Sequence, residues 1–174
     1  MTAQTVSIFA VLLSVLLAVG WYLSYTAVRL DRLHTRLDAT AAALDVQVVR
    51  RAECAIELAY AGGLDPAGSA LVLDVARASL EQEGPWTRQR REAESAMTAI
   101  LRRVLADGDE CAAMQDCALR VRLARRFHNE AVDRTRAVRR RPVVRALRLA
   151  GHTDLPEPVD FDDDWPGVTG ARAA

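Results

Sequence analysis

Residues 6–28 read VSIFAVLLSVLLAVGWYLSYTAV, and no charged side chain precedes Arg29. A helix of this length spans about 34 Å, and the hydrocarbon core of a bilayer is about 30 Å thick. Trp21 and Tyr25 lie near the C-terminal end of the stretch, where aromatic side chains favour the headgroup layer. The stretch therefore predicts an N-terminal transmembrane helix over residues 1–28.

A cleaved signal peptide is the competing interpretation, because Ala18-Val19-Gly20 resembles a small-x-small cleavage site. The first five residues, MTAQT, carry no lysine or arginine, although signal peptides usually do. The helical pattern also continues through this site into residues 29–37. We therefore expect an uncleaved, single-pass anchor.

The orientation of this anchor follows from the charges that flank it. Five arginines follow the span closely, whereas only the α-amino group precedes it; they are Arg29, Arg32, Arg36, Arg50 and Arg51. The positive-inside rule then places the N-terminus outside and the rest of the chain in the cytoplasm, at a cell inner (cytoplasmic) membrane.

The three cysteines, Cys54, Cys111 and Cys117, argue against a disulfide framework, because their number is odd. We expect them to be unpaired small apolar residues, which suits a reducing cytoplasm. Cys111 and Cys117 are six residues apart, about 240° around a helix, so they do not share a metal-binding face.

Beyond the span, apolar residues recur every three or four positions, which predicts an all-α chain. The first helix continues from the span to about Ala61-Gly62-Gly63, and three more follow at about 68–82, from Thr87 to Asp107-Gly108-Asp109, and at 110–140. A shorter helical segment covers 143–150. We expect an antiparallel, four-helix-like bundle over residues 29–151, followed by an acidic tail with prolines and glycines at 152–174. The expected buried residues include Leu30, Leu33, Leu44, Val48, Leu71, Val75, Ala76, Leu80, Met97, Leu101, Met114, Cys117, Val121, His128, Thr135 and Val138.

No catalytic fingerprint is found in the sequence. Asp31-x-x-His34 places a carboxylate and an imidazole on one helical face, but a di-iron bundle needs a second such motif. His34 is expected to be solvated near the membrane, and His128 to be a buried bundle residue. We therefore expect no enzyme, no cofactor and no metal site.

Acidic and basic residues balance at 23 each, which argues against a general polyanion-binding protein. Residues 120–148 nevertheless carry eleven arginines against Glu130 and Asp133. In an up-down bundle the last long helix returns to the membrane, where each arginine contributes about 1 kcal/mol to binding anionic headgroups. Nucleic acid fits less well, because Phe127 is the only aromatic residue there for stacking. The candidate lipid- or partner-binding residues are Arg139, Arg140, Arg141, Arg145 and Arg148.

Three stretches of the sequence form a recognisable set: Ala27-Val28-Arg29-Leu30 through Leu44-Asp45-Val46-Gln47-Val48-Val49-Arg50-Arg51, then Glu94-Ser95-Ala96-Met97 with Leu101, and finally Arg125-Arg126-Phe127-His128-Asn129 with Glu130-Ala131-Val132. In this order they resemble the LemA family of bacterial proteins. His128 stands where the family usually has tyrosine. The family-motif residues carried over are Asp45, Gln47, Arg50, Arg51, Arg126, Phe127 and Asn129. The resemblance implies a membrane-anchored helical bundle without catalytic residues, whose biochemical role is undefined.

Two functions remain open at this stage. The first is a single-pass membrane protein whose bundle is an interaction or scaffolding module for a protein partner. The alternative is a membrane-tethered regulator that acts through the Arg-rich stretch on anionic lipid or nucleic acid. We expect residues 156–174 to contribute little to the fold and to moderate Arg139–Arg148, although Phe161 and Trp165 could dock in a groove of the bundle.

Overall fold

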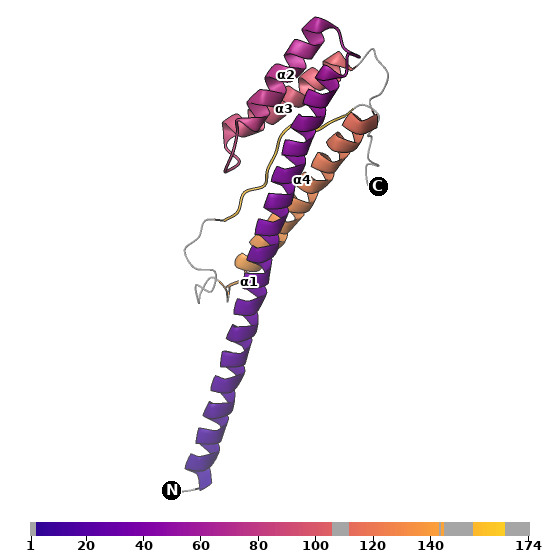
Figure 1. Ribbon diagram of the computed structural model, residues 1–174. Coiled ribbons are helices and arrows are strands. Elements are labelled where there is room, and N and C mark those ends of the chain that lie inside the picture. Colours follow the sequence, from indigo (N-terminus) through magenta and orange to yellow (C-terminus); the bar gives the residue numbers. More distant parts are fainter. Residues whose placement is uncertain (1–2, 106–111, 143, 145–154, 166–174) are drawn as a thin grey trace, which may run out of the picture. The chain divides into compact units, whose positions relative to one another are not determined.

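The computed structural model describes residues 3–105, 112–142, 144 and 155–165. All regular secondary structure in these ranges is helical, in the order α1 (Ala3–Tyr60), α2 (Pro66–Leu80), α3 (Arg88–Val104) and α4 (Ala112–Arg139) (Figure 1). The predicted all-α class is confirmed. The segment expected at 143–150 and the end of the tail after Trp165 lie almost wholly outside the described residues.

Helix α1 runs without a break from the apolar N-terminal stretch to Tyr60, as predicted. It closes where the N–H of Ala61 donates to the carbonyl of Glu57 over 3.0 Å. Gly62 follows with φ of 77°, a left-handed conformation that favours glycine at a helix end.

Helices α2 and α3 both begin at an N-cap side chain. Asp65 accepts hydrogen bonds from the backbone N–H groups of Ala67 and Gly68, and Pro66 occupies the first helical position. Thr87 accepts from the N–H of Arg90 over 3.2 Å. The Asp-Pro signal explains why α2 starts two residues before its predicted start at 68.

The buried face of α2 was predicted wrongly in part. Leu71 is 46% exposed, and the buried residues are Gly68, Val72, Ala76 and Ser79. A Cβ at Gly68 would lie 3.3 Å from Cγ1 of Val104, so α2 and α3 approach closely at this glycine. The close approach turns small residues of α2 inward, which a count of apolar residues does not detect.

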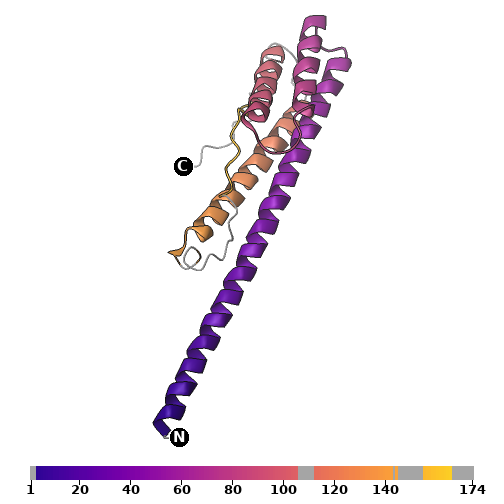
Figure 2. The same ribbon diagram turned by 90° about the vertical axis from the view of Figure 1, so that its left-hand side faces the viewer.

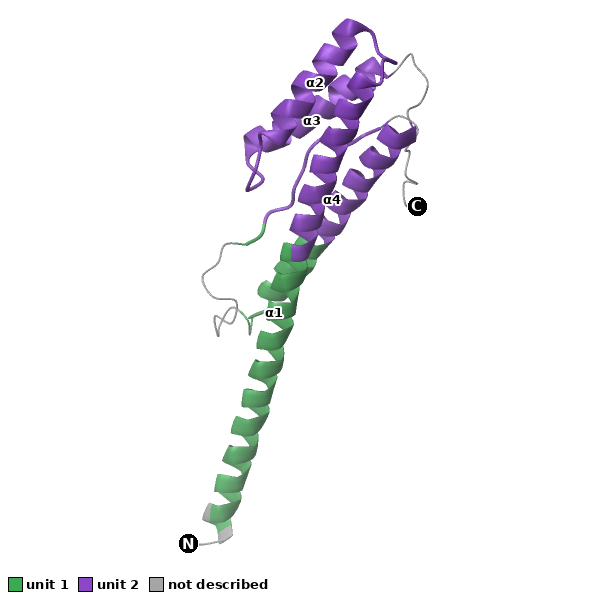
Figure 3. Cartoon of the chain, in the orientation of Figure 1, with its two compact units in different colours: residues 1–38, 131–156 green, residues 39–130, 157–174 purple. Residues whose placement is uncertain are grey.

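The chain forms two compact units, and each contains part of α1 and part of α4 (Figure 3). Unit 1 comprises Met1–Asp38 and Ala131–Pro156, and unit 2 comprises Ala39–Glu130 and Glu157–Ala174. In unit 1, Leu30 packs with Val138 and Val144, and Leu33 lies against them.

Unit 2 holds most of the core. Contacts of Leu44 with Val121, and of Cys54 with Cys117, pair α1 and α4 in antiparallel directions. Ser79 contacts Glu94, so α2 is joined to α3 as well. In both ribbon views α2 and α3 lie beside the C-terminal part of α1 (Figures 1 and 2).

The described part of the tail, residues 155–165, contributes to this core, contrary to the expectation that the tail adds little to the fold. Val159 and Phe161 are buried in a cluster with Leu44, Val48 and Val121. The expected docking of Phe161 is confirmed, and Trp165 packs against the neighbouring cluster. The contribution of the tail was underestimated because Val159, two residues before Phe161, is buried as well, among many aspartates.

Candidate functional site

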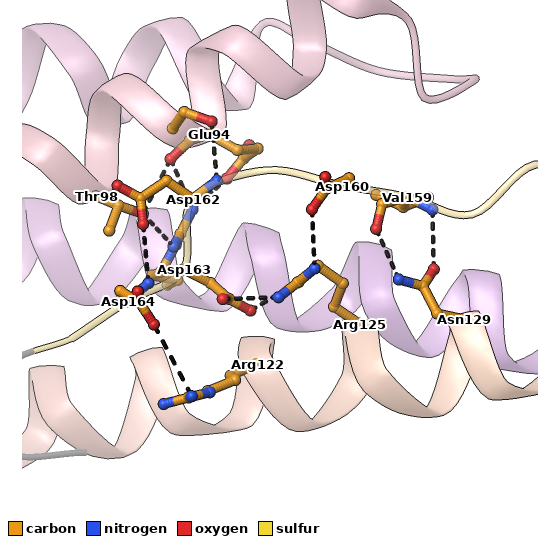
Figure 4. Close-up of polar contacts among 12 residues, drawn as sticks. Glu94, Thr98, Arg122, Arg125, Asn129, Val159, Asp160, Asp162, Asp163 and Asp164 are labelled. Atoms are coloured by element: carbon orange, nitrogen blue, oxygen red, sulfur yellow. Dashed lines mark hydrogen bonds and ion pairs between the residues drawn. The ribbon is translucent and has the colours of Figure 1, made fainter. Parts of the chain in front are cut away.

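An extended segment of the tail, residues 157–165, lies between α3 and α4 of unit 2 (Figures 2 and 4). Its buried side chains alternate: Val159, Phe161 and Asp163 are buried, whereas Asp160 and Asp164 are exposed. A two-residue period is what an extended chain shows when one side faces a groove. We call this groove, with the residues that hold the segment, the tail groove.

Asn129 of α4 holds the backbone of the segment. Its Nδ2 donates to the carbonyl oxygen of Val159 over 2.8 Å, and the N–H of Val159 donates to its Oδ1 over 2.8 Å (Figure 4). One side chain thus satisfies both polar backbone groups of a buried residue.

Phe161 occupies an aromatic and cationic slot. Its ring stacks on Trp86 with centroids 5.5 Å apart and an angle of 10° between the planes. The guanidinium carbons of Arg125 and Arg51 lie 5.5 and 5.9 Å from the ring centroid. The slot therefore combines apolar burial with two cation–π contacts.

Carboxylates of the segment pair with arginines of α3 and α4. Arg125 binds Asp163 through two bonds, Nε to Oδ2 at 2.7 Å and Nη2 to Oδ1 at 2.8 Å. Arg102 donates to Asp162 over 2.6 Å, and the N–H of Asp162 donates to Oγ of Ser95 over 3.1 Å. The two-bond pair is the stronger type, because a guanidinium matches the geometry of a carboxylate.

The pKa of Asp162 reflects these contacts. Partial burial alone would raise it, but the hydrogen bond from the backbone of Asp164 and the charge and hydrogen bond of Arg102 together lower it below its usual range. Asp162 is therefore held in its charged form in the groove.

A buried ion pair of Arg51 with Glu94 lies next to Phe161 of the segment. Nη2 of Arg51 is 2.5 Å from Oε2 of Glu94, and these side chains are 2% and 0% exposed. Arg51 also donates to Oγ1 of Thr98 over 3.0 Å, and Ser79 donates to the other oxygen of Glu94 over 2.6 Å. Helices α1, α2 and α3 thus share one buried polar network.

A second pair flanks the slot. Arg90 of α3 binds Asp45 of α1 over 2.8 Å and donates to the carbonyl of Gly84. Its guanidinium carbon lies 4.0 Å from the centroid of the Trp86 ring, so Arg90 supports the ring on which Phe161 stacks.

The structure brings together some of the residues that the LemA resemblance singled out. Asp45, Arg51 and Asn129 all take part in the networks around the tail groove. For the other four, no hydrogen bond or ion pair with the described segment is found: Arg50 pairs with Glu53 and Glu57 at the surface, Gln47 is half-buried, and Arg126 and Phe127 are exposed.

Several arginines of the described part of the Arg-rich stretch are engaged within the chain. Arg122 and Arg125 face acids of the tail, Arg136 donates to the carbonyl of Pro156 over 2.6 Å, and Arg120 pairs with Asp116. Among the described residues, acids of the tail contact Arg102, Arg122 and Arg125. The expected moderation of Arg139–Arg148 by the tail stays a prediction. Of the candidate lipid ligands, Arg139 is half-buried, Arg140 and Arg141 are exposed, and Arg145 and Arg148 lie outside the described residues.

Cys54 and Cys117 form a disulfide between α1 and α4, which corrects the expectation of unpaired cysteines. Both lie on the buried stripes of their helices, so antiparallel pairing brings them together although 63 residues separate them. An open hollow of about 650 Å³ lies beside the disulfide and is rimmed by Arg50, Glu53 and Asp116. Cys111 lies outside the described residues.

The histidines do not form a metal site within the described residues, where no group of three or more His, Cys, Asp or Glu is close enough to hold an ion. His128 is buried, as predicted, and its Nδ1 lies 3.4 Å from Oγ1 of Thr40. Burial lowers the pKa of His128, and the charge of Asp45 opposes this only in part. His34 is half-buried.

Sequence reasoning missed Glu94 as the partner of Arg51, and it missed Arg125 and Trp86 as parts of the groove. A signal for Glu94 is visible, since it lies on the same helical stripe as Met97 and Leu101. A charge on a buried stripe requires a partner, and Arg51 occupies a similar position in α1.

In comparisons with known proteins, no family model, curated protein or solved structure matches this chain. Among the described residues, one helix, α1, is long and apolar enough to cross a membrane.

Proposed function

We propose that this chain is a single-pass membrane protein whose helical bundle is an interaction or scaffolding module. The observation that carries the proposal is the N-terminal part of α1. Its large apolar side chains are exposed, for example Phe9 at 74%, Leu17 at 66% and Trp21 at 72%. Such a continuous apolar surface needs a nonpolar environment, and its length suits a bilayer.

Membrane fractionation with alkaline carbonate washing tests the anchor. The wild-type chain should stay in the membrane, whereas Leu16→Arg, which costs about 2.5–3.5 kcal/mol near the centre of a span, should shift part of it to the soluble fraction. Val46→Arg is the matched control, because Val46 lies on the same helix beyond the span and has the same 62% exposure as Leu16. Equal retention of both variants would contradict the anchor.

The proposed orientation places the bundle in the cytoplasm, supported by Arg29, Arg32 and Arg36 after the span. The Cys54–Cys117 disulfide favours the opposite side, because disulfides persist in oxidising compartments. Trapping the thiol state with a maleimide in intact cells decides between them. Reduced cysteines support the cytoplasmic bundle, and a disulfide in all molecules overturns this orientation.

We further propose a LemA-like membership for the chain. The support is the order of the three resembling stretches, together with the meeting of Asp45, Arg51, Glu94 and Asn129 around one groove. The helical order α1 to α4 agrees with the bundle that this resemblance implies. A role as a scaffold rather than an enzyme accords with the helical bundle and with the resemblance.

A second candidate function is regulation through anionic lipid, and unit 1 supplies the observation in its favour. Val138 packs with Leu30, which brings the end of α4 close to the position where the proposed span ends. Arg140 and Arg141 are exposed there, and three arginines of α1, with Tyr25, line a hollow of about 320 Å³: Arg29, Arg32 and Arg36.

Lipid analysis of the full chain in nanodiscs of mixed composition tests this candidate. Anionic lipid should be enriched around the wild-type chain, and Arg140→Ala with Arg141→Ala should reduce the enrichment. Arg103→Ala, an exposed arginine on α3, is the control. Equal enrichment in all three proteins would exclude regulation through anionic lipid. Binding of nucleic acid instead of lipid would point to regulation through nucleic acid.

A further inference from the structure

We propose that the tail groove is a recognition site for an extended acidic peptide of a partner protein. The peptide carries, in order, an aliphatic, an acidic, an aromatic and two acidic residues, as Val159-Asp160-Phe161-Asp162-Asp163 does. The chain's own segment occupies the groove as an internal competitor. The inference rests on the proposed interaction function and names the class of partner that the module would bind.

The groove recognises the segment by three different means at three alternate positions. Asn129 holds the backbone of residue 159, Trp86 and two guanidinium groups hold the ring of residue 161, and Arg125 holds the carboxylate of residue 163. Backbone hydrogen bonds with pockets for alternate side chains are how proteins generally bind extended peptides. This combination of contacts selects peptides with a particular sequence pattern. A groove that only covered apolar surface would not make that selection.

The segment is attached through side chains of the groove. Of the backbone–backbone hydrogen bonds outside the helices, none in the described part of the chain involves residues 155–165. The polar contacts that hold it come from side chains of the helices: Asn129, Arg125, Arg122, Arg102 and Ser95. Release of the segment would therefore leave the hydrogen bonds of every helix intact, as a local opening requires.

The charge of the groove restricts which peptides fit. Arg102 and Arg125 both point to carboxylates of the segment, whereas Arg51 is already compensated by Glu94. A basic or neutral peptide would leave the half-buried Arg125 without a counterion, which costs free energy. An acidic peptide with an aromatic residue satisfies the guanidinium groups and the ring of Trp86 together.

The tail of a second copy is the competing occupant. If two copies exchanged their tails, the same residues would form the same contacts in each groove. The exchange would therefore add no contact within the groove. A partner peptide can gain further contacts outside residues 159–163. We therefore assign the groove to a partner protein.

Peptide binding to the full chain in mild detergent tests the proposal. The probe is a fluorescein-labelled peptide with the sequence of residues 155–165, measured by fluorescence anisotropy. Phe161→Ala with Asp163→Asn weakens the internal competitor and leaves the groove unchanged, so this chain should bind the probe at least tenfold more tightly than wild type. Adding Asn129→Ala to that chain should abolish the gain, and a scrambled probe of equal charge should not bind. Equal affinity of the two chains, or equal binding of the scrambled probe, would overturn the proposal.

Two further measurements complete the test. If the double variant does not fold, hydrogen exchange of the wild-type chain replaces it: saturating probe should accelerate exchange at residues 157–165, and unchanged exchange would refute recognition. Energy transfer between a donor on one tail and an acceptor beside the groove of another copy would assign the groove to self-association and overturn a partner. Detergent makes the assay independent of membrane insertion, so a chain that binds the probe but washes off membranes contradicts the proposed function alone.

Discussion

Removing the carboxylate of Glu94 should be among the most damaging single changes in unit 2. The Glu94→Ala variant leaves Arg51, which is 2% exposed, without its counterion and removes the acceptor of the Ser79 hydroxyl. Loss of one member of a buried ion pair costs about 3–5 kcal/mol. Since a whole domain is stable by about 5–15 kcal/mol, this variant should lose a large share of its stability.

The reasoning also predicts what a double replacement does. In Arg51→Met with Glu94→Leu, both buried charges are absent and the volume is largely kept. Such replacements are neutral or stabilising by about 1–4 kcal/mol in other proteins. The double variant should therefore unfold at a higher denaturant concentration than Glu94→Ala, although it has lost more hydrogen bonds.

Urea titration in mild detergent, followed by circular dichroism, measures both effects. Glu92→Ala on the same helix is the control, because its pair with Arg88 is exposed and its loss should leave the transition unchanged. If Glu94→Ala melted like the control, the carboxylate would not be the counterion on which Arg51 depends. If the double variant were the less stable one, the penalty would arise from lost packing and not from an unpaired charge.

The other predictions concern the pairing of α1 with α4 and the pH response. Leu44→Ala, at a fully buried site, should lower the free energy of unfolding by about 2–5 kcal/mol in the urea titration, and an unchanged value would refute the packing of α1 against Val121. Reduction with dithiothreitol should lower the same quantity by about 2–4 kcal/mol, because the Cys54–Cys117 bond closes a long loop; a Cys54→Ala chain should not respond. Because the folded state lowers the pKa of His128, the unfolded state binds the proton first as pH falls below about 6.5, so stability should decrease from pH 7 to pH 5. His128→Gln should flatten this decrease in thermal melts, and an equal slope would place its origin elsewhere.

The helices were readable from the sequence because their signals are local. Gly62 ends α1 and Thr87 caps α3. Most of the buried stripe of α4 from Met114 to Val138 was predicted as well, although Ala118 and Val132 were not. The face of α2 was less readable, since its orientation depends on the close approach at Gly68, a contact with another helix.

The candidate site was only partly predictable for the same reason. Asn129 and Arg51 were named through a resemblance, but their roles depend on residues far along the chain, Val159 and Glu94. Composition also misled: the aspartates around Phe161 suggested a solvated tail, whereas arginines on two helices neutralise them. Ion pairs between residues that are far apart in the sequence leave no local pattern by which they could be predicted from one sequence.

The hydrogen bonds between Asn129 and Val159 hold the segment independently of which side chain stands at position 159. Its amide contacts two main-chain atoms that every residue except proline presents, so a change of side chain at 159 alters packing and keeps both bonds. A synthetic mimic of the segment with an N-methyl group on this residue would keep the side chain and lose one bond. The affinity of a ligand designed for this groove could thus be lowered one hydrogen bond at a time, with the shape of the ligand almost unchanged.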